Sequence, residues 1–167
     1  LNYLVGFAAF SPNRKLNQVS SQYQQVLLYP SSVALTSDNE FVLADSGHSR
    51  VLVSGGGGSV RSIAHEEFLE PMSVALDKDD NIYVADRAET TSQREEGKVM
   101  VMSLSGKLLR SSTRWFDREA QVWHPFGHQL QIALDPEGNI FVSDYINETV
   151  MCLNPHFEGR GYTEFDG

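Results

Sequence analysis

The stretch that decides the fold lies at residues 81–86 and reads Asn81-Ile82-Tyr83-Val84-Ala85-Asp86. It is rich in β-branched and aromatic residues, as strands are, and it stops on an aspartate. Two further strand-like runs end in the same way, and they read Phe41-Val42-Leu43-Ala44-Asp45 and Ile140-Phe141-Val142-Ser143-Asp144. A catalytic carboxylate is needed once or twice in a domain, whereas an architectural one can recur in every structural unit. The recurrence therefore points to a repeat.

The three runs occupy equivalent places in an internal repeat. Residues 28–35 (Leu-Tyr-Pro-Ser-Ser-Val-Ala-Leu) align with residues 69–76 (Leu-Glu-Pro-Met-Ser-Val-Ala-Leu), and residues 123–135 form a looser third copy. The spacing to the terminal aspartate is constant, from Thr36 to Asp45, Asp77 to Asp86 and Asp135 to Asp144. Each copy continues with an alternating strand, a turn that contains Gly or Pro, and a fourth strand. Four short strands in a repeat of about 40 residues predict a blade of an all-β propeller.

The repeat divides the chain into successive units. We expect residues 29–69 to form one blade, residues 70–123 a second blade with long loops, and residues 124–167 a third. Residues 1–28 fit the second half of a blade, its third and fourth strands. The chain would then hold about three and a half blades of a ring that normally has four to eight. The rest of the ring would be supplied by sequence outside this chain.

The motifs resemble the NHL repeat, whose domains are usually six-bladed β-propellers. The resemblance is carried by Pro-x-x-Val-Ala-Leu-Asp at residues 71–77, Asn-Ile-Tyr-Val-Ala-Asp at residues 81–86 and Arg-Val-x-Val at residues 50–53. It covers nearly all of residues 29–167, although the first unit has Thr36 where the turn aspartate is usual. NHL repeats occur in tripartite-motif ubiquitin ligases and in peptidyl-hydroxyglycine lyases, so the repeat alone names no function.

The recurring aspartates are predicted to be structural turn locks rather than catalytic residues, and they are Asp45, Asp86 and Asp144. At the end of a strand, a carboxylate can accept hydrogen bonds from backbone N–H groups of the following turn. In the first unit we expect Gly47 to supply a positive φ in that turn and Arg50 to pair with the carboxylate. Three equivalent positions in three units favour this architectural role.

Two histidines, His124 and His128, are the candidates for a metal site, because they lie near the expected start of an innermost strand. In the lyases that share this repeat, the metal ligands typically follow the proline directly. Here those positions hold Ser31, Met72 and Phe126, so the resemblance does not carry lyase chemistry over to this chain. A metal site also needs further partners in space. We therefore predict no catalytic set and no cofactor.

The charge balance bears on possible partners. The net charge is −9, from 22 acidic and 13 basic residues. An acidic chain repels phosphate backbones, which makes nucleic acid an unfavourable partner. Residues 98–123 are locally basic, with 5 basic and 2 acidic residues. The longest apolar run, residues 4–10, is too short to span a bilayer. Cys152 is the single cysteine, so the chain cannot form an internal disulfide.

Residues 87–97 form a longer polar segment than the equivalent places in the other units. We expect a loop here that contacts a protein partner, because charges of both signs suit a specific polar interface. The candidate contact residues are Arg87, Glu89, Arg94, Glu95 and Glu96. A tolerated surface insertion is the alternative, since loops lengthen at small cost.

Three functions remain open from the sequence. The first hypothesis is a non-enzymatic protein-interaction or scaffold module, because the repeat is accompanied by loop insertions and by no convergent catalytic set. The second is a metal-dependent propeller enzyme of the lyase or lactonase type. The third is an RNA-binding propeller, which the net acidity disfavours.

Overall fold

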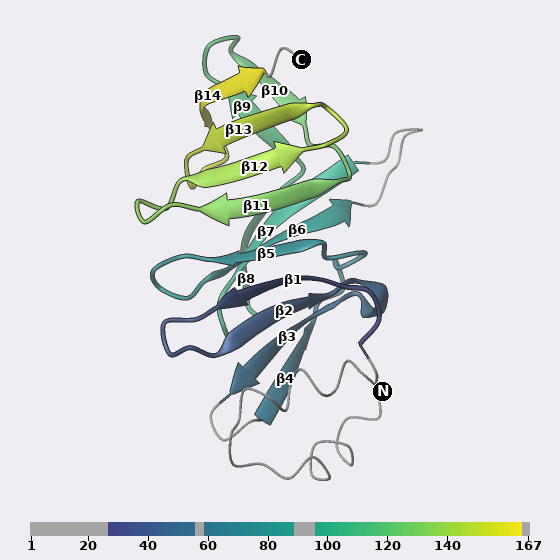
Figure 1. Cartoon of the computed structure of the whole chain (residues 1–167). Helices are drawn as coiled ribbons and strands as arrows, with labels where there is room; N and C mark the ends of the chain where they lie inside the picture. The colour runs from purple at the N-terminus through teal and green to yellow at the C-terminus, as the bar shows by residue number, and fades with distance from the viewer. Residues whose placement is uncertain (1–26, 56–58, 89–95, 165–167) are drawn as a thin grey trace.

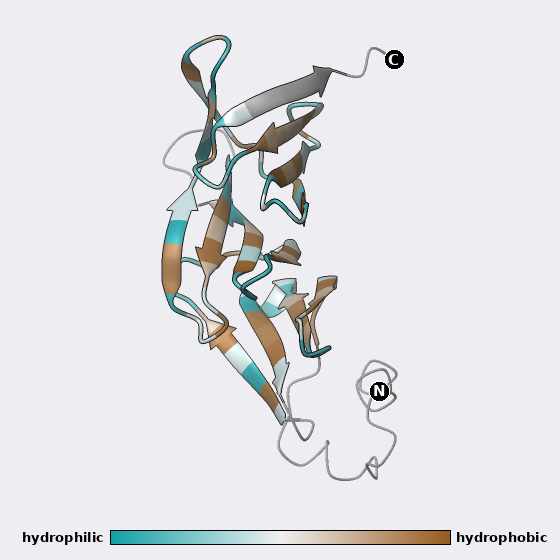
Figure 2. Cartoon of the chain, turned by 90° about the vertical axis from the view of Figure 1, so that its left-hand side faces the viewer, coloured by the Kyte–Doolittle hydropathy of each residue, from teal (hydrophilic) through white to brown (hydrophobic). Residues whose placement is uncertain are grey.

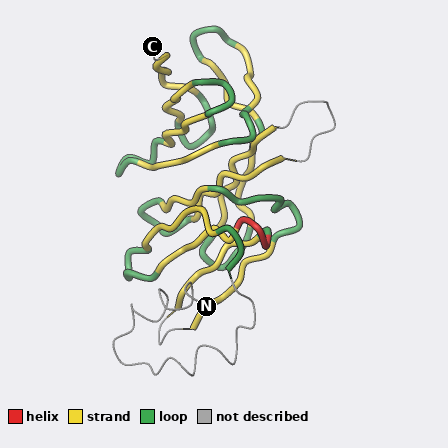
Figure 3. The backbone as a smooth tube through the Cα atoms, turned by 45° about the vertical axis from the view of Figure 1, so that its right-hand side comes forward, coloured by secondary structure: helices red, strands yellow, loops and turns green. Residues whose placement is uncertain are grey.

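A computed structural model of the chain describes residues 27–55, 59–88 and 96–164 (Figure 1). Over these residues the fold is all-β, and one short 3₁₀ helix, η2 (Ser46–His48), interrupts the strands (Figure 3). No helix in the described ranges has the length and hydrophobicity of a membrane span. The half blade expected at residues 1–28 lies outside the described residues, except for Leu27 and Leu28.

The strands form three four-stranded antiparallel sheets, and in each sheet consecutive strands pair with one another. The first sheet contains β1 (Pro30–Leu35), β2 (Phe41–Asp45), β3 (Arg50–Gly55) and β4 (Ser59–Ala64). The second contains β5 (Ser73–Leu76), β6 (Ile82–Ala88), β7 (Glu96–Met102) and β8 (Leu108–Ser112). The third contains β11 (Leu130–Leu134), β12 (Ile140–Asp144), β13 (Thr149–Leu153) and β14 (Gly159–Glu164). These four-stranded meanders confirm the predicted blade type.

The three sheets stack side by side, with their first strands adjacent. Strand β5 lies between β1 and β11, and the other strands of each sheet run outward from this line (Figure 1). Two serine hydroxyls join the first strands. Ser32 Oγ accepts a hydrogen bond from Val74 N at 3.1 Å, and Ser73 Oγ accepts one from Ile132 N at 3.1 Å. We call these two bonds the serine clamps.

The strand alternation explains how one sheet packs against two neighbours. On β6, Ile82 and Val84 face the first sheet, whereas Tyr83 and Ala85 face the third, because successive side chains point to opposite faces. All four side chains are buried. Apolar residues therefore gather along the strands and between the sheets, while the turns are polar (Figure 2). The core consists of two layers, one between each pair of sheets.

The extra residues before Pro125 were expected to be loop, and the structure shows a hairpin instead. It consists of β9 (Arg114–Asp117) and β10 (Val122–Pro125). Trp115 is buried in the core between the second and third sheets, and Phe116 N donates to Phe157 O at 2.8 Å. His124 and Pro125 thus belong to the hairpin, and the first strand of the third sheet begins later, at Leu130.

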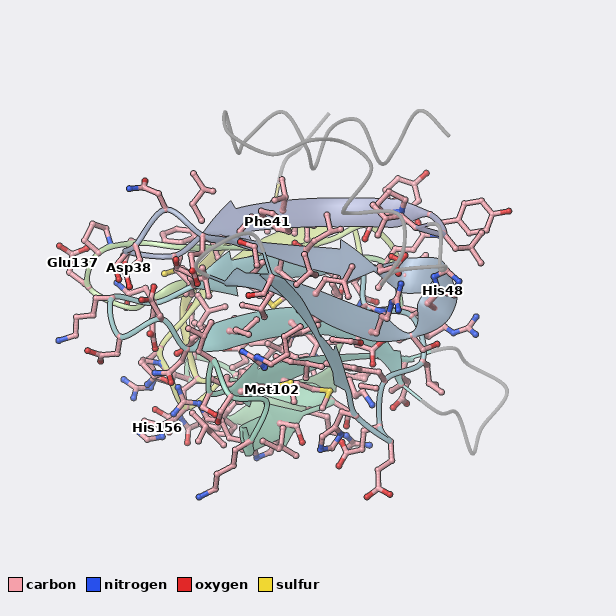
Figure 4. All side chains as sticks on the ribbon, turned by 90° about the horizontal axis from the view of Figure 1, so that it is seen from below. Asp38, Phe41, His48, Met102, Glu137 and His156 are labelled. Carbon is pink, nitrogen blue, oxygen red and sulfur yellow. The ribbon has the colours of Figure 1, made fainter. Side chains whose placement is uncertain are left out.

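The sheets have two chemically different ends. At one end, the lock end, the recurring aspartates end the second strand of the first and third sheets, and Asp86 lies two residues before the end of β6. At the other, the turn end, short polar turns join the first two strands of each sheet. The view from below shows His48 at the lock end, and Asp38 and Glu137 together at the turn end (Figure 4). At the turn end, Asp80 links the first two sheets by accepting hydrogen bonds from Ser37 N and Ser37 Oγ.

Candidate functional site

The lock aspartates, Asp45, Asp86 and Asp144, are almost completely buried. The Asp45 carboxylate accepts a hydrogen bond from Leu28 N at 2.8 Å. Its other oxygen lies 2.7 Å from Arg50 Nε and 2.9 Å from His48 Nδ1. Arg50 therefore pairs with Asp45 across the β2–β3 connection, and the buried charge is compensated.

The other two locks repeat this geometry. Asp86 accepts hydrogen bonds from Leu69 N at 3.1 Å and Glu70 N at 2.6 Å, and Asp144 accepts one from Gly127 N at 2.8 Å. In all three sheets the bonded N–H group lies 17 residues before the aspartate, in the segment that enters the first strand. The following turn, which we expected to supply the donors, contributes only part of them. The locks chiefly hold the entry to each blade.

The turn after Asp45 also differs from the expectation for Gly47. The left-handed residue is Ser49, with φ 49°, and Gly47 does not have a positive φ. Gly47 N donates to Leu28 O at 2.8 Å, and a Cβ atom on Gly47 would lie 2.4 Å from Leu28 Cγ. Glycine is required here because the entry segment approaches closely.

Burial raises the pKa of Asp86 above its usual 3.8, although hydrogen bonds from Glu70 N and Leu69 N and the charge of Lys98 oppose this effect. Asp135 provides an internal comparison, because hydrogen bonding from the Asn139 side chain lowers the pKa of this exposed carboxyl below 3.8. In a carboxyl-carbon NMR titration we expect Asp86 to protonate at a higher pH than Asp135. The reverse order would contradict the burial argument.

The raised pKa of Asp86 also determines how its contribution to stability changes with pH. The pKa of Asp86 is higher in the folded chain than in the unfolded chain. Its contribution to stability is therefore fully present below pH 3.8 and is lost as the pH rises through the folded pKa.

Among the residues that the structure describes, no cation pairs with the third lock as Arg50 and Lys98 pair with the other two. Arg50 and Lys98 pair with the lock aspartates from the start of the third strand, whereas Thr149 occupies the equivalent position opposite Asp144. The Asn147 amide takes the cation's place, with Nδ2 2.7 Å from the Asp144 carboxylate. Thr149 Oγ1 is buried and has no hydrogen-bond partner among the described residues.

This unsatisfied hydroxyl leads to a stability prediction. We expect Thr149→Val to raise the free energy of unfolding by about 1 kcal/mol, because it removes an unpaired buried oxygen and preserves the side-chain shape. Chemical denaturation of the two proteins measures the difference. Destabilisation by a similar amount would show that the hydroxyl is hydrogen-bonded in solution.

A cleft of about 630 Å³ lies at the lock end, where the three sheets converge. The residues that line it come from the entry segments, the first strands and the residues on either side of the locks. They are Ser31, Glu70, Met72, Arg87, His128, Gln129, Leu130, Gln131, Ser143 and Tyr145. No single blade could form this cleft, because every sheet contributes to its wall.

The locks position the side chains of the cleft. Glu70 donates its backbone N–H directly to Asp86, and His128 follows Gly127, which donates to Asp144. Arg87 and Tyr145 are the residues immediately after these two aspartates. These two locks therefore lie directly beside residues of the cleft wall.

The polar groups of the cleft form both interactions between sheets and looser surface pairs. Ser31 Oγ and Ser46 Oγ lie 2.7 Å apart, and each lies within hydrogen-bonding distance of Pro71 O in the next sheet. Arg87 Nη1 lies 3.7 Å from Glu70 Oε2, and both side chains are more than two-fifths exposed. Such a loose, exposed ion pair stabilises the fold little, so both groups remain available to a ligand.

The two candidate metal ligands lie in different surroundings. His128 lines the cleft, whereas His124 belongs to the β9–β10 hairpin. The His124 ring stacks on Trp115 with a centroid distance of 4.9 Å, and His124 Nε2 lies 3.8 Å from Asp117 Oδ2. Within residues 27–55, 59–88 and 96–164, no three His, Cys, Asp or Glu side chains come together in a metal-binding group.

The candidate contact segment at residues 87–97 is less loop-like than the sequence suggests. Strand β6 continues through Arg87 to Ala88, and β7 already begins at Glu96, which pairs with Ala88 and forms an isolated bridge to Gly127. This pairing extends the second sheet beyond its lock. The remaining candidates, Glu89, Arg94 and Glu95, lie outside the described residues.

The comparisons with known proteins agree with this architecture. Residues 27–53 match the family model described as the NHL repeat. This match covers the entry segment, the first lock and most of β3, so these residues form an NHL repeat. No curated protein matches the chain.

The solved structures that are similar in fold include the following three. Virginiamycin B lyase from Staphylococcus aureus, in an inactive variant with quinupristin, is 9% identical, with a TM-score of 0.55, over 83% of this chain and 42% of that one. Hydrazine synthase of Kuenenia stuttgartiensis is 13% identical, with a TM-score of 0.60, over 87% and 38%. A putative gluconolactonase is 19% identical, with a TM-score of 0.52, over 81% and 49%. At these identities the likeness concerns the propeller fold alone, and this chain spans less than half of each structure.

Proposed function

We propose that this β-propeller chain, with its NHL repeat at residues 27–53, is a non-enzymatic protein-interaction module that binds its partner at the lock end. The cleft formed by all three sheets carries the proposal. It combines an exposed aromatic residue, Tyr145, with loosely paired charges and amide side chains. Tyrosine and arginine are enriched at protein interfaces, where they supply both apolar area and hydrogen bonds.

Other features at the same end support this surface. Tyr145 is 75% exposed, and the neighbouring Ile146 is also exposed. The β6–β7 extension beyond the lock places Arg87 in the cleft wall and leads into the candidate contact segment at residues 87–97. In this proposal residues 29–69, 70–123 and 124–167 act as successive blades, and their entry segments jointly form the binding surface.

The test is affinity capture from the native source with the unaltered chain and with Tyr145→Ala. We expect a specific partner to be retained by the unaltered chain and reduced by about tenfold or more in Tyr145→Ala, as for an interface hot spot. Leu109→Ala is the matched control, because Leu109 is also an exposed apolar residue but lies on β8, outside the cleft. Equal capture by all three proteins would contradict the proposed surface.

A metal-dependent enzyme is the second candidate, because His128 and Glu70 both line the cleft. The similar structures include a lyase and a putative gluconolactonase, which keeps this alternative open. Metal analysis of the purified protein separates the two functions. Stoichiometric zinc or calcium that is lost in His128→Ala would favour the enzyme, whereas a metal-free protein that binds its partner would favour the interaction module.

A further inference from the structure

The β9–β10 hairpin presents an outer face that the packing of the three sheets does not use. Its inner face carries Trp115, which is buried in the core and stacks on His124. Because successive side chains alternate, the outer face carries Arg114, Phe116 and Trp123. The centroids of the Phe116 and Trp123 rings lie 5.3 Å apart, and Trp123 is 52% exposed. The hairpin is thus anchored by one tryptophan and exposes the other.

The hairpin is held in place from its β9 side. It lies in the interior of the chain, between β8 and β11, so the sheets on both sides of it in the sequence are described. Phe116 forms an isolated parallel bridge to Glu158, and Arg118 in the hairpin turn pairs with the same glutamate. These contacts fix β9 to the third sheet and leave the β10 side of the hairpin without a neighbouring strand in the described ranges.

The backbone of β10 offers hydrogen-bonding groups on this side. Facing residues of an antiparallel pair either bond to each other or point their N–H and C=O groups away from the partner strand. Phe116 N donates to Phe157 O, away from β10, so Trp123, which faces Phe116, directs both of its groups to the outer side of β10. Pro125 O on the same side is approached by Asn147 Nδ2 at 3.4 Å, whereas the Trp123 groups meet no described strand.

The outer face is basic, although the whole chain is acidic. Arg114 is exposed, and among the described residues its guanidinium has no acidic partner. Residues 98–123, which include the first strand of the hairpin, hold 5 basic and 2 acidic residues, against a net charge of −9 for the chain. Arginine and tryptophan are the residues most enriched at interface hot spots. A ligand that carries carboxylates together with apolar side chains therefore complements this face.

We propose that the outer face of the β9–β10 hairpin is a second docking site, which binds an extended acidic peptide segment of a partner beside β10. The peptide backbone pairs with Trp123 N–H and C=O, an apolar side chain packs on the indole ring, and a carboxylate pairs with Arg114. In such strand addition, main-chain hydrogen bonds supply affinity and side-chain contacts supply specificity. None of these residues lines the lock-end cleft, so the site does not rest on the function proposed for the cleft.

The first test uses a fluorescent octapeptide of alternating glutamate and valine, titrated with the full chain and followed by anisotropy. We expect saturable binding that weakens as the salt concentration rises. The same peptide with glutamine in place of glutamate should bind about tenfold more weakly, because the charge pairing is lost. A peptide with a central proline should also bind more weakly, since proline lacks an N–H group. No binding, or equal binding of all three peptides, would overturn the proposal.

Substitutions locate the binding site on the hairpin. Trp123→Ala and, separately, Arg114→Gln should each raise the dissociation constant of the acidic peptide by about tenfold. Leu109→Ala, at an exposed apolar position on β8, and Lys107→Gln, at an exposed cation beside it, are the matched controls and should bind like the unaltered chain. Circular dichroism checks that each variant is folded. Unchanged affinity in both hairpin variants would contradict the assignment.

Acrylamide quenching of tryptophan fluorescence tests whether the site is open in the free chain. The difference between the unaltered chain and Trp123→Phe reports Trp123 alone, because Trp115 is buried in both proteins. We expect this emission to be readily quenched in the free chain and protected when the acidic peptide is bound. Protection already in the free chain would show that the chain itself covers the face, and the proposal would fall. Partner capture by the cleft is measured separately, so either proposal can fail without the other.

Discussion

Replacing Asp86 by alanine is expected to lower the free energy of unfolding by about 3–5 kcal/mol, the range for breaking a buried ion pair. The substitution leaves Lys98, whose side chain is 9% exposed, without the carboxylate 3.6 Å away. It also removes the acceptor of three backbone N–H groups, those of Leu69, Glu70 and Arg87. The cost is expected because the buried partner groups lose their acceptor, although the desolvation of the ionised carboxyl, which raises its pKa, offsets part of it.

Chemical denaturation measures this loss of stability. Two further variants serve as controls for its cause. Asp135→Ala removes an exposed turn carboxylate that binds Asn139, and it should cost much less. Combining Asp86→Ala with Lys98→Met should recover part of the loss, because the second change removes a buried charge whose remaining carboxylate neighbour is Glu67, at 3.9 Å. A cost for Asp86→Ala no larger than that for Asp135→Ala would refute the structural role of this lock.

Gly127→Ala is expected to cost about 3 kcal/mol, at the upper end for overpacking a buried site. A Cβ atom at this position would lie 2.3 Å from Asp144 Oδ1 and 2.8 Å from Ile146 Cβ. The third lock cannot easily move aside, because Gly127 N donates to the same carboxylate. The neighbouring Gly97 adds a second restraint, since a Cβ there would lie 2.0 Å from Gly127 O.

Gly138→Ala is the matched control for this prediction. Gly138 has φ +83°, and a Cβ atom on it would meet nothing within 4 Å. Its replacement should cost only the backbone strain of a left-handed alanine, about 1 kcal/mol. Thermal or chemical unfolding of both variants separates steric crowding from backbone strain. Similar costs at the two positions would mean that the entry segment adjusts freely around Gly127.

The aspartates could be recognised from the sequence because the same residue type recurs at the same distance from the first strand. Their main partners could not, because the Leu28, Leu69 and Gly127 N–H groups reach them only once the chain has folded back along two strands. The sequence around a strand end identifies the turn that follows. It does not identify the segment that lies beside the strand end in the folded chain. The expectation of turn donors therefore leaves out the donors in the entry segments.

The β9–β10 hairpin could have been predicted from the sequence. Arg114–Asp117 and Val122–Pro125 are short aromatic-rich segments on either side of a polar turn, a pattern typical of a hairpin. The repeat alone predicts a loop here, because a four-stranded unit has no place for a further hairpin. The cleft, in contrast, could not be predicted from the sequence. Its walls come from three sheets, and which residues face one another there depends on how the sheets stack.

The serine clamps and the two-layered core have a consequence for the order in which the chain opens. The second sheet is packed on both faces, whereas each outer sheet has one described neighbour. Interactions therefore run from each sheet to the next, and a terminal sheet can detach without exposing both faces of the middle one. Amide hydrogens in β6 and β7 would then exchange with solvent only through global unfolding, while those of the outer sheets would exchange through local opening.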